Sequence, residues 1–194
     1  MISFGLILAS ACSFAVAHPT TAPRAIALVP LGEAPAAEVG ALSPILRATF
    51  GAEILVAPAI PLPQDSYDAS RRQYRSAAIL NVLSRARRPE WERALGVADV
   101  DLFVPDLNFV FGEADSRRGV AVFSLARLRT SDEALFARRA ATEAIHELGH
   151  TWGLSHCTDP HCVMWFSNTL SESDRKGTRF CPRHEEELAR ARGR

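Results

Sequence analysis

The sequence predicts a single α/β domain with a mixed, twisted sheet, and three observations lead to this prediction. A chain of 194 residues suits one domain. Hydrophobic residues make up 47% and charged residues 23% of it, which is the balance of a folded protein rather than a disordered one. Short apolar runs alternate with stretches of helical periodicity, and this alternation is typical of α/β proteins.

The apolar runs predict four strands. Residues 25–32 and 52–60 are short apolar runs in the first third of the chain. Residues 101–112, interrupted by a proline, and residues 119–128 are rich in Phe and Val. The turn signal at 115–119 predicts that the last two strands form a hairpin.

Helical patterns predict helices at 36–49, 67–87 and 132–152, and a short charged helix is expected at about 184–192. Pro44 implies that the first of these is kinked or begins late. Ser131 or Asp132 is the expected N-cap of the third, and Gly153 is expected to end it.

The first 17 residues, MISFGLILASACSFAVA, carry no charge and are typical of a secretory leader with a small-x-small cleavage site before His18. Cleavage before Cys12 would instead make a lipoprotein, and a wrongly assigned start codon would leave a cytosolic protein. We therefore expect a secreted or periplasmic protein, lipid-anchored if Cys12 is modified, with a cytoplasmic location as the alternative. The run is too short for a membrane span in the mature chain.

The charge balance argues against a nucleic-acid partner. The chain has 22 basic and 22 acidic side chains, and phosphate binding needs an excess of positive charge. Lys176 is the only lysine, which we interpret as genome composition. We expect a monomer.

Residues 146–156 read HELGHTWGLSH and predict a zinc site. His146 and His150 are one helical turn apart, so both rings project from one face of the helix. Gly153 can take a positive φ, which lets the chain turn sharply and return His156 to the metal as a third ligand. Glu147 lies beside the metal without binding it, where a general base for a zinc-activated water belongs. The alternative is a pair of surface histidines, which leaves the glycine and third histidine unexplained.

The string H-E-x-x-H-x-x-G-x-x-H resembles the extended metzincin signature. Metzincins carry a methionine in a tight turn beneath the metal, and Met164 lies eight residues after His156. This methionine is expected to pack beneath the ligands and not to bind zinc.

The residues that follow resemble archaemetzincins, in which the metzincin string runs into C-x4-C-x-M and then into C-x-x-C. The corresponding stretches here are His156-Cys157, Cys162-Val163-Met164 and Cys181-Pro182-Arg183-His184, and the upstream stretches DVDLFVPDLNFVFGEA and FSLARL are also similar. The resemblance implies a metzincin-like domain and a second, structural zinc held by the cysteines.

One residue departs from the family pattern, because His184 stands where archaemetzincins have a fourth cysteine. Zinc accepts three thiolates and one imidazole, so Cys157, Cys162, Cys181 and His184 are the expected ligands. His161 could compete as the fourth ligand. A disulfide between two of the cysteines is a further alternative, and it would leave one thiol unpaired.

The predicted function is a zinc-dependent peptidase that hydrolyses peptide bonds with a zinc-activated water and Glu147 as general base, using two Zn²⁺ ions, one catalytic and one structural. The alternatives are a catalytically silent zinc-stabilised binding module and a zinc hydrolase acting on another amide. Family architecture implies that an extended peptide pairs with an edge strand, for which 119–128 is the candidate. Trp152, Trp165 and Phe166 flank the site, with Trp152 expected in the core.

We divide the chain into the leader (1–17), an N-terminal subdomain with the sheet and the active-site helix (18–153), and a smaller C-terminal subdomain (154–194). The last part would hold the third zinc ligand, the methionine turn and the structural zinc.

Overall fold

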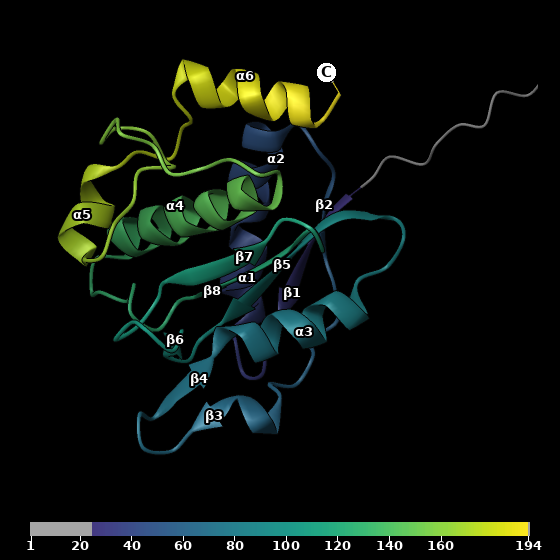
Figure 1. Ribbon diagram of the computed structural model, residues 1–194, viewed down its shortest axis with the longest axis vertical. Helices are drawn as coiled ribbons and strands as arrows, with labels where there is room; N and C mark the ends of the chain where they lie inside the picture. The colour runs from purple at the N-terminus through teal and green to yellow at the C-terminus, as the bar shows by residue number, and fades with distance from the viewer. Residues whose placement is uncertain (1–24, 194) are drawn as a thin grey trace, which may run out of the picture.

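A mixed five-stranded sheet forms the centre of the molecule. The computed structural model describes residues 25–193, so the expected leader and Cys12 lie outside the described residues. The strand order is β2-β1-β5-β8-β7, and only β7 runs antiparallel to its neighbour. The strands are β1 (Ala25–Pro30), β2 (Ile54–Val56), β5 (Trp91–Ala98), β7 (Gly112–Asp115) and β8 (Val120–Ser124). The α/β fold and the β7–β8 hairpin are confirmed (Figure 1).

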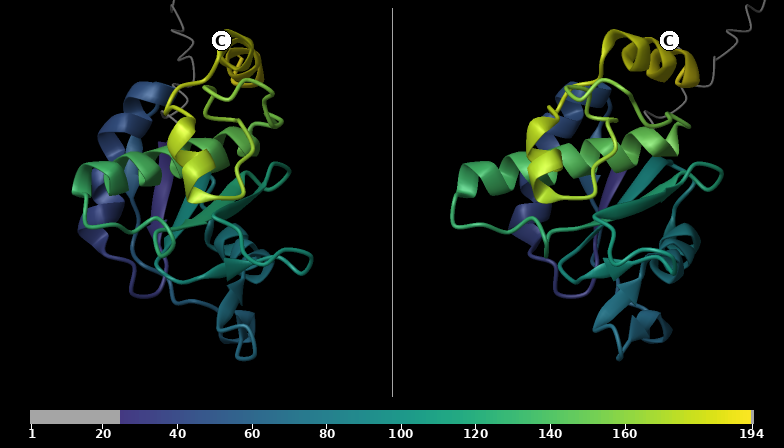
Figure 2. Two further views of the ribbon diagram at one scale, coloured as in Figure 1. Left: turned by 90° about the vertical axis from the view of Figure 1, so that its left-hand side faces the viewer. Right: turned by 60° about the vertical axis from the view of Figure 1, so that its left-hand side comes forward.

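Helices cover both faces of this sheet, as Figures 1 and 2 show. One face packs against α1 (Ala36–Ala41), α2 (Ser43–Phe50) and α4 (Glu133–Thr151), and the other packs against α3 (Ser76–Ala86). Alternate residues of β1 serve the two layers: Ile26 and Leu28 face the first, while Ala27 and Val29 face the second. Because both faces are covered, β1 is buried throughout and appears in the sequence as an unbroken apolar run.

The central strand β5 was not among the expected strands. Its sequence, WERALGVA, begins with two charged residues after Trp91 and contains Gly96, so it lacks the unbroken apolar run of β1. Gly96 packs closely against Leu31, and an added Cβ would lie only 2.8 Å from Leu31 Cδ1. The close packing explains why a residue without a side chain stands in this strand. Long-range pairing with β1 and β8, which the local pattern does not reveal, makes this segment a strand.

The helix predicted at 67–87 was wrong over residues 67–75. Residues 67–75 form β3 (Tyr67–Asp68) and β4 (Gln73–Arg75), which join β6 (Leu102–Phe103) in a small second sheet, and α3 begins only at Ser76. Asp68 Oδ1 accepts hydrogen bonds from the backbone N–H groups of Ser70 and Arg71. This local turn competes with the helix, and Arg72 between the strands has a φ of 53°.

The strand proposed as the peptide-binding edge was also wrong. β8 lies between β5 and β7, so β7 is the edge on this side of the sheet. The expected strand at 101–112 is divided between β6 and the start of β7, with an irregular loop at 104–111 between them.

After α4 the chain forms loops and two further helices, α5 (Leu170–Arg175) and α6 (Pro182–Ala191). Helix α6 begins two residues earlier than expected, and α5 was not expected. The division into subdomains at Gly153 stays a prediction. Among the described residues no helix is both long and apolar enough to cross a bilayer.

Candidate metal centres and active-site cleft

Helix α4 brings two imidazoles together, as the motif predicts. Asp132 caps the helix by accepting a hydrogen bond from the Leu135 N–H at 3.0 Å. One turn separates His146 from His150, and their Nε2 atoms lie 3.1 Å apart. Two nitrogens bound to one tetrahedral zinc at about 2.0–2.1 Å would be separated by roughly 3.3 Å. The pair is therefore spaced for a shared cation.

The end of α4 returns the chain toward these rings. The N–H of Gly153, where φ is 84°, donates to His150 O, and the N–H of Leu154 donates to Gly149 O. These two bonds form a Schellman motif, which ends a helix with a left-handed residue. His156 follows this turn, and its ligand atom lies within 4.8 Å of those of His146 and His150. The predicted three-histidine cluster is therefore assembled in the structure.

Backbone carbonyls orient both helix histidines. His146 Nδ1 lies 2.8 Å from Val163 O, and His150 Nδ1 lies 2.7 Å from Leu154 O. An Nδ1–H that donates to a carbonyl leaves the Nε2 lone pair free for a metal. Burial lowers the pKa of His146 well below its ordinary value and lowers the pKa of His150 to about 4. Both rings are thus neutral near pH 7, and their chemistry fits zinc.

Glu147 is a buried carboxylate beside this cluster. Its side chain lines the same cleft as the three histidines, and the residue is only 5% exposed. Within residues 25–193 its carboxylate makes no hydrogen bond or ion pair, and its oxygens reach the open cleft. Burial, followed by the nearby Glu143 carboxylate, raises the pKa of Glu147 well above its ordinary value. A raised pKa of this kind suits a group that accepts and later returns a proton.

Two glycines allow the close packing around α4. A Cβ on Gly112, at the start of β7, would lie 2.6 Å from both Glu147 Oε1 and Val122 O. A Cβ on Gly149 would lie 2.6 Å from the sulfur of Met164, which is fully buried. Met164 therefore packs against the helix between the two histidines, as expected, while β7 lies against the catalytic candidate.

Three cysteines and His184 form a second cluster. All four ligand atoms lie within 4.8 Å of one another. The Cys157 and Cys181 sulfurs are 3.8 Å apart, and His184 Nδ1 lies 3.4 Å from the sulfurs of both Cys162 and Cys181. Zinc bonds of about 2.3 Å to sulfur and 2.05 Å to nitrogen predict tetrahedral edges of roughly 3.8 and 3.5 Å. The donor set and its spacing fit a closed zinc site.

The alternatives for this cluster receive no support. Cys157, Cys162 and Cys181 are free thiols, and a separation of 3.8 Å is far longer than a disulfide bond. His161 is exposed and lies outside the cluster, whereas His184 is buried within it. Burial raises the pKa of the Cys162 thiol to about 12, so a thiolate here needs a neighbouring cation.

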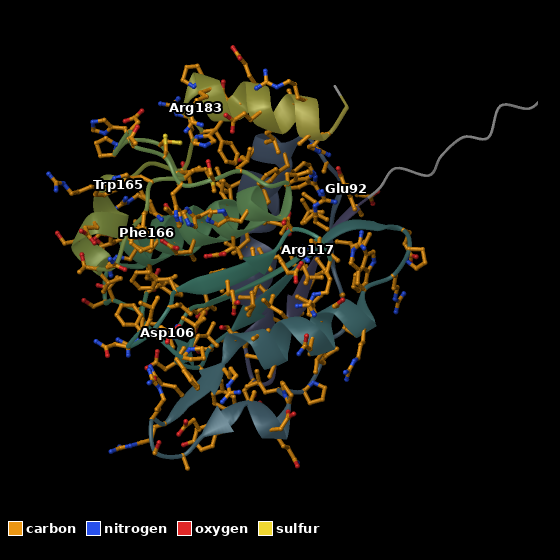
Figure 3. The ribbon with its side chains drawn as sticks, in the orientation of Figure 1. Glu92, Asp106, Arg117, Trp165, Phe166 and Arg183 are labelled. Carbon is orange, nitrogen blue, oxygen red and sulfur yellow. The ribbon has the colours of Figure 1, made fainter. Side chains whose placement is uncertain are left out.

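A cleft of about 710 Å³ opens over the first cluster. One side is formed by the loop 107–111 and the edge strand β7, and another by the segment 166–168 that follows Met164. Phe166 lines the cleft, is 47% exposed and lies with its ring 4.8 Å from that of His156. Figure 3 shows Trp165 and Phe166 near α5. Trp152 instead stacks on Phe50 in the core, as expected.

Four residues near the cleft were not predicted to belong to the site, namely Gly112, Glu113, Glu143 and Lys176. A signal was present for two of them. A glycine inside a strand often marks a close approach to the backbone, and Gly112 is such a case. The lone lysine was assigned to genome composition, yet it is buried beside the cleft. Glu113 and Glu143 resemble ordinary surface carboxylates in the sequence.

The comparisons with known proteins agree with this geometry. The model of peptidase family M54 matches residues 60–190. Archaemetzincin from Methanopyrus kandleri is 47% identical over 129 residues, which are 66% of this chain and 73% of that protein. Archaemetzincin from Archaeoglobus fulgidus is 43% identical over 143 residues, which are 74% of this chain and 86% of that protein.

The fold agrees as well. The crystal structure of the M. kandleri archaemetzincin superposes with a TM-score of 0.82 at 38% identity, and the match covers 92% of this chain and 100% of that one. The matched residues include every member of the two clusters. This chain therefore belongs to peptidase family M54, the archaemetzincins, and is a zinc metallopeptidase.

Proposed function

We propose that this protein hydrolyses peptide bonds at a zinc ion held by His146, His150 and His156, with Glu147 as general base. The observation that carries the proposal is the Glu147 side chain, which belongs to a residue only 5% exposed, makes no hydrogen bond or ion pair with the described residues and faces the same cleft as the imidazoles. A buried carboxylate is costly unless it is paired or has a function. A purely structural three-histidine site would have no use for it.

The chemistry divides between the metal and the protein. When bound, zinc acts as a Lewis acid toward the scissile carbonyl and lowers the pKa of a water toward neutrality. Glu147 takes the proton from the attacking water and passes it to the leaving amine. Val163 O and Leu154 O hold two of the imidazoles in position throughout.

The edge strand β7 is the proposed surface for the peptide. Its partner on one side is β8, and on the other side no strand from residues 25–193 continues this sheet. An extended peptide could pair there by strand addition, which gives affinity through main-chain hydrogen bonds. Glu147 lies directly against Gly112 of this strand, so a peptide at this edge would pass the catalytic carboxylate.

We further propose that Cys157, Cys162, Cys181 and His184 hold a second zinc with a structural role. This cluster is largely buried, and none of its members is among the residues that line the cleft in the described part of the chain. Metal analysis of the purified protein should give two zinc ions per chain. A value of one would remove one of the two proposed sites.

Substitution of Glu147 tests the catalytic assignment. Glu147→Ala should retain both zinc ions but lower peptide cleavage about 10²–10⁴-fold, the usual contribution of a general base. Glu133→Ala is the matched control, because Glu133 lies on the same helix but is exposed in its first turn. Cleavage would be followed with internally quenched peptides and zinc by mass spectrometry. Undiminished cleavage by the Glu147 variant would show that another group acts as the general base.

A further inference from the structure

The only lysine of the chain is buried behind the cleft. Lys176 is 1% exposed. The other Lys/Arg positions of the chain are all arginines. Its Nζ lies 3.2 Å from Glu143 Oε1 and 3.5 Å from the carbonyl oxygen of Trp165. Both partners adjoin the cleft, because Glu143 lines it and Trp165 precedes the lining segment 166–168.

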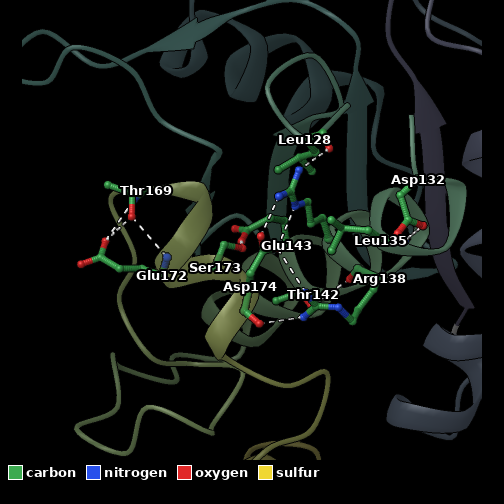
Figure 4. A network of polar contacts seen from close by, with 11 residues as sticks. Leu128, Asp132, Leu135, Arg138, Thr142, Glu143, Thr169, Glu172, Ser173 and Asp174 are labelled. Atoms are coloured by element: carbon green, nitrogen blue, oxygen red, sulfur yellow. Dashed lines mark hydrogen bonds and ion pairs between the residues drawn. The ribbon is translucent and has the colours of Figure 1, made fainter. Parts of the chain in front are cut away.

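Glu143 connects this lysine to the active-site helix. It lies on α4 one turn before Glu147 and is 2% exposed. Its Oε1 also accepts a hydrogen bond from Ser173 Oγ at 2.7 Å. Ser173 belongs to α5, so these contacts fasten α5 to α4, as Figure 4 shows. The neighbouring Asp174 adds a bidentate pair with Arg139 at 2.7 and 2.6 Å.

The lining segment is held at both ends. Residues 165–168, which we call the cleft wall, follow the buried Met164. At the other end a capping box begins α5, in which Glu172 Oε2 accepts hydrogen bonds from the Asn168 and Thr169 N–H groups at 2.8 and 3.1 Å. Lys176 reaches the first residue of the wall from inside, and α5 fixes the last. The wall itself is short, so its position follows from these attachments.

We propose that Lys176 is a positioning residue that sets the cleft wall and thereby selects the substrate side chain beside the scissile bond. This inference rests on the proposed peptidase function. A compact ammonium with three donors can satisfy the Glu143 carboxylate and the Trp165 carbonyl together, whereas a planar guanidinium is bulkier and its donors are fixed in one plane. Phe166 leaves apolar area open to the cleft, so the preferred substrate carries a bulky apolar side chain there.

A peptide series measures this selection. The probes are internally quenched peptides that differ only in the residue on the carboxyl side of the scissile bond, from Ala to Leu to Phe. Lys176→Met should raise KM for the Leu and Phe peptides and reduce the Leu-to-Ala ratio of kcat/KM about tenfold. Any effect of the lost charge on Glu147 is common to all the peptides and cancels in this ratio. Arg175→Met is the matched control, since this exposed neighbour loses a charge outside the buried pair.

A double variant separates positioning from folding. Removing Lys176 alone leaves a buried, unpaired carboxylate, whereas replacing both partners with apolar residues is often neutral for stability. Glu143→Leu combined with Lys176→Met should therefore fold and bind zinc, yet show the same loss of selectivity. A stable double variant with the native Leu-to-Ala ratio would contradict the proposal.

A measurement without catalysis distinguishes this inference from the proposed function. If the native protein cleaves none of the peptides, the peptidase proposal fails and the wall can still be examined. Amide hydrogen exchange of residues 165–168 should be faster in the double variant than in the native protein and in Arg175→Met. Equal exchange in all three proteins would show that Lys176 does not hold the wall.

Discussion

The two ligand clusters are adjacent along the chain but differ in access and in charge. The three-histidine cluster lies in the cleft, and His156 is exposed. In the cysteine cluster three of the four members are buried, and none lines the cleft within residues 25–193. Zinc with three neutral imidazoles keeps its charge of about +2, whereas three thiolates reverse it to about −1. The three-histidine cluster would leave zinc its Lewis acidity and its access to water. The cysteine cluster suits a structural zinc that joins two segments of the chain.

We expect that zinc can be lost from the three-histidine cluster without being lost from the cysteine cluster. His156→Ala should abolish peptide cleavage and reduce the zinc content from two ions to one, because two imidazoles hold zinc poorly. His161→Ala is the matched control, since this exposed histidine lies in the same loop but in neither cluster. Zinc analysis and peptide assays of both variants check this prediction. Retention of two zinc ions by His156→Ala would contradict the assigned ligand set.

Loss of zinc from the cysteine cluster should lower both the stability of the protein and its peptidase activity. Cys181→Ser should remove the second zinc and lower the free energy of unfolding by on the order of 5 kcal/mol, because binding free energy at a structural zinc contributes to folding. Activity should fall as well, since Cys157 adjoins His156. Thermal unfolding monitored by circular dichroism measures the effect, with the exposed Thr158→Ala as control. Native stability in Cys181→Ser would show that the cluster holds no structural metal.

A smaller effect on activity is expected from a change in β7, the edge strand beside the three-histidine cluster. Gly112→Ala should lower kcat by about 100-fold or less at unchanged zinc content, because the new Cβ would displace Glu147 or the edge strand. Gly40→Ala is the control, since no atom lies within 4 Å of its Cβ and alanine favours the helix. Steady-state kinetics would reveal the difference. Equal kcat values for the two variants would mean that the strand does not position Glu147.

The three-histidine cluster could be predicted almost completely from the sequence, because its members lie on one short stretch of chain whose local backbone conformation places them. One helical turn sets His146 and His150, and Gly153 permits the bend that returns His156. The cysteine cluster joins segments 19 or more residues apart, so its assignment depended on the family resemblance. Its ligand set agrees with the observed grouping of Cys157, Cys162, Cys181 and His184.

Features that depend on distant contacts were not predictable in this way. The strand β5 is defined by its neighbours β1 and β8, and the edge position of β7 follows from the order of the whole sheet. The turn at Asp68 replaces a helix that the apolar periodicity favoured. The importance of Lys176 also appears only when α5 is placed against α4, because the sequence alone shows a single lysine without its partner.

His156 and Cys157 are consecutive residues that serve different clusters. If both clusters bind zinc as proposed, ordering the loop around the second ion also restricts the backbone that presents His156 to the first. Metal uptake should then be cooperative, with occupancy of the cysteine cluster strengthening the affinity of the histidine cluster. By the reciprocity of such linkage, a chelator that empties the cleft would also weaken retention of the buried ion.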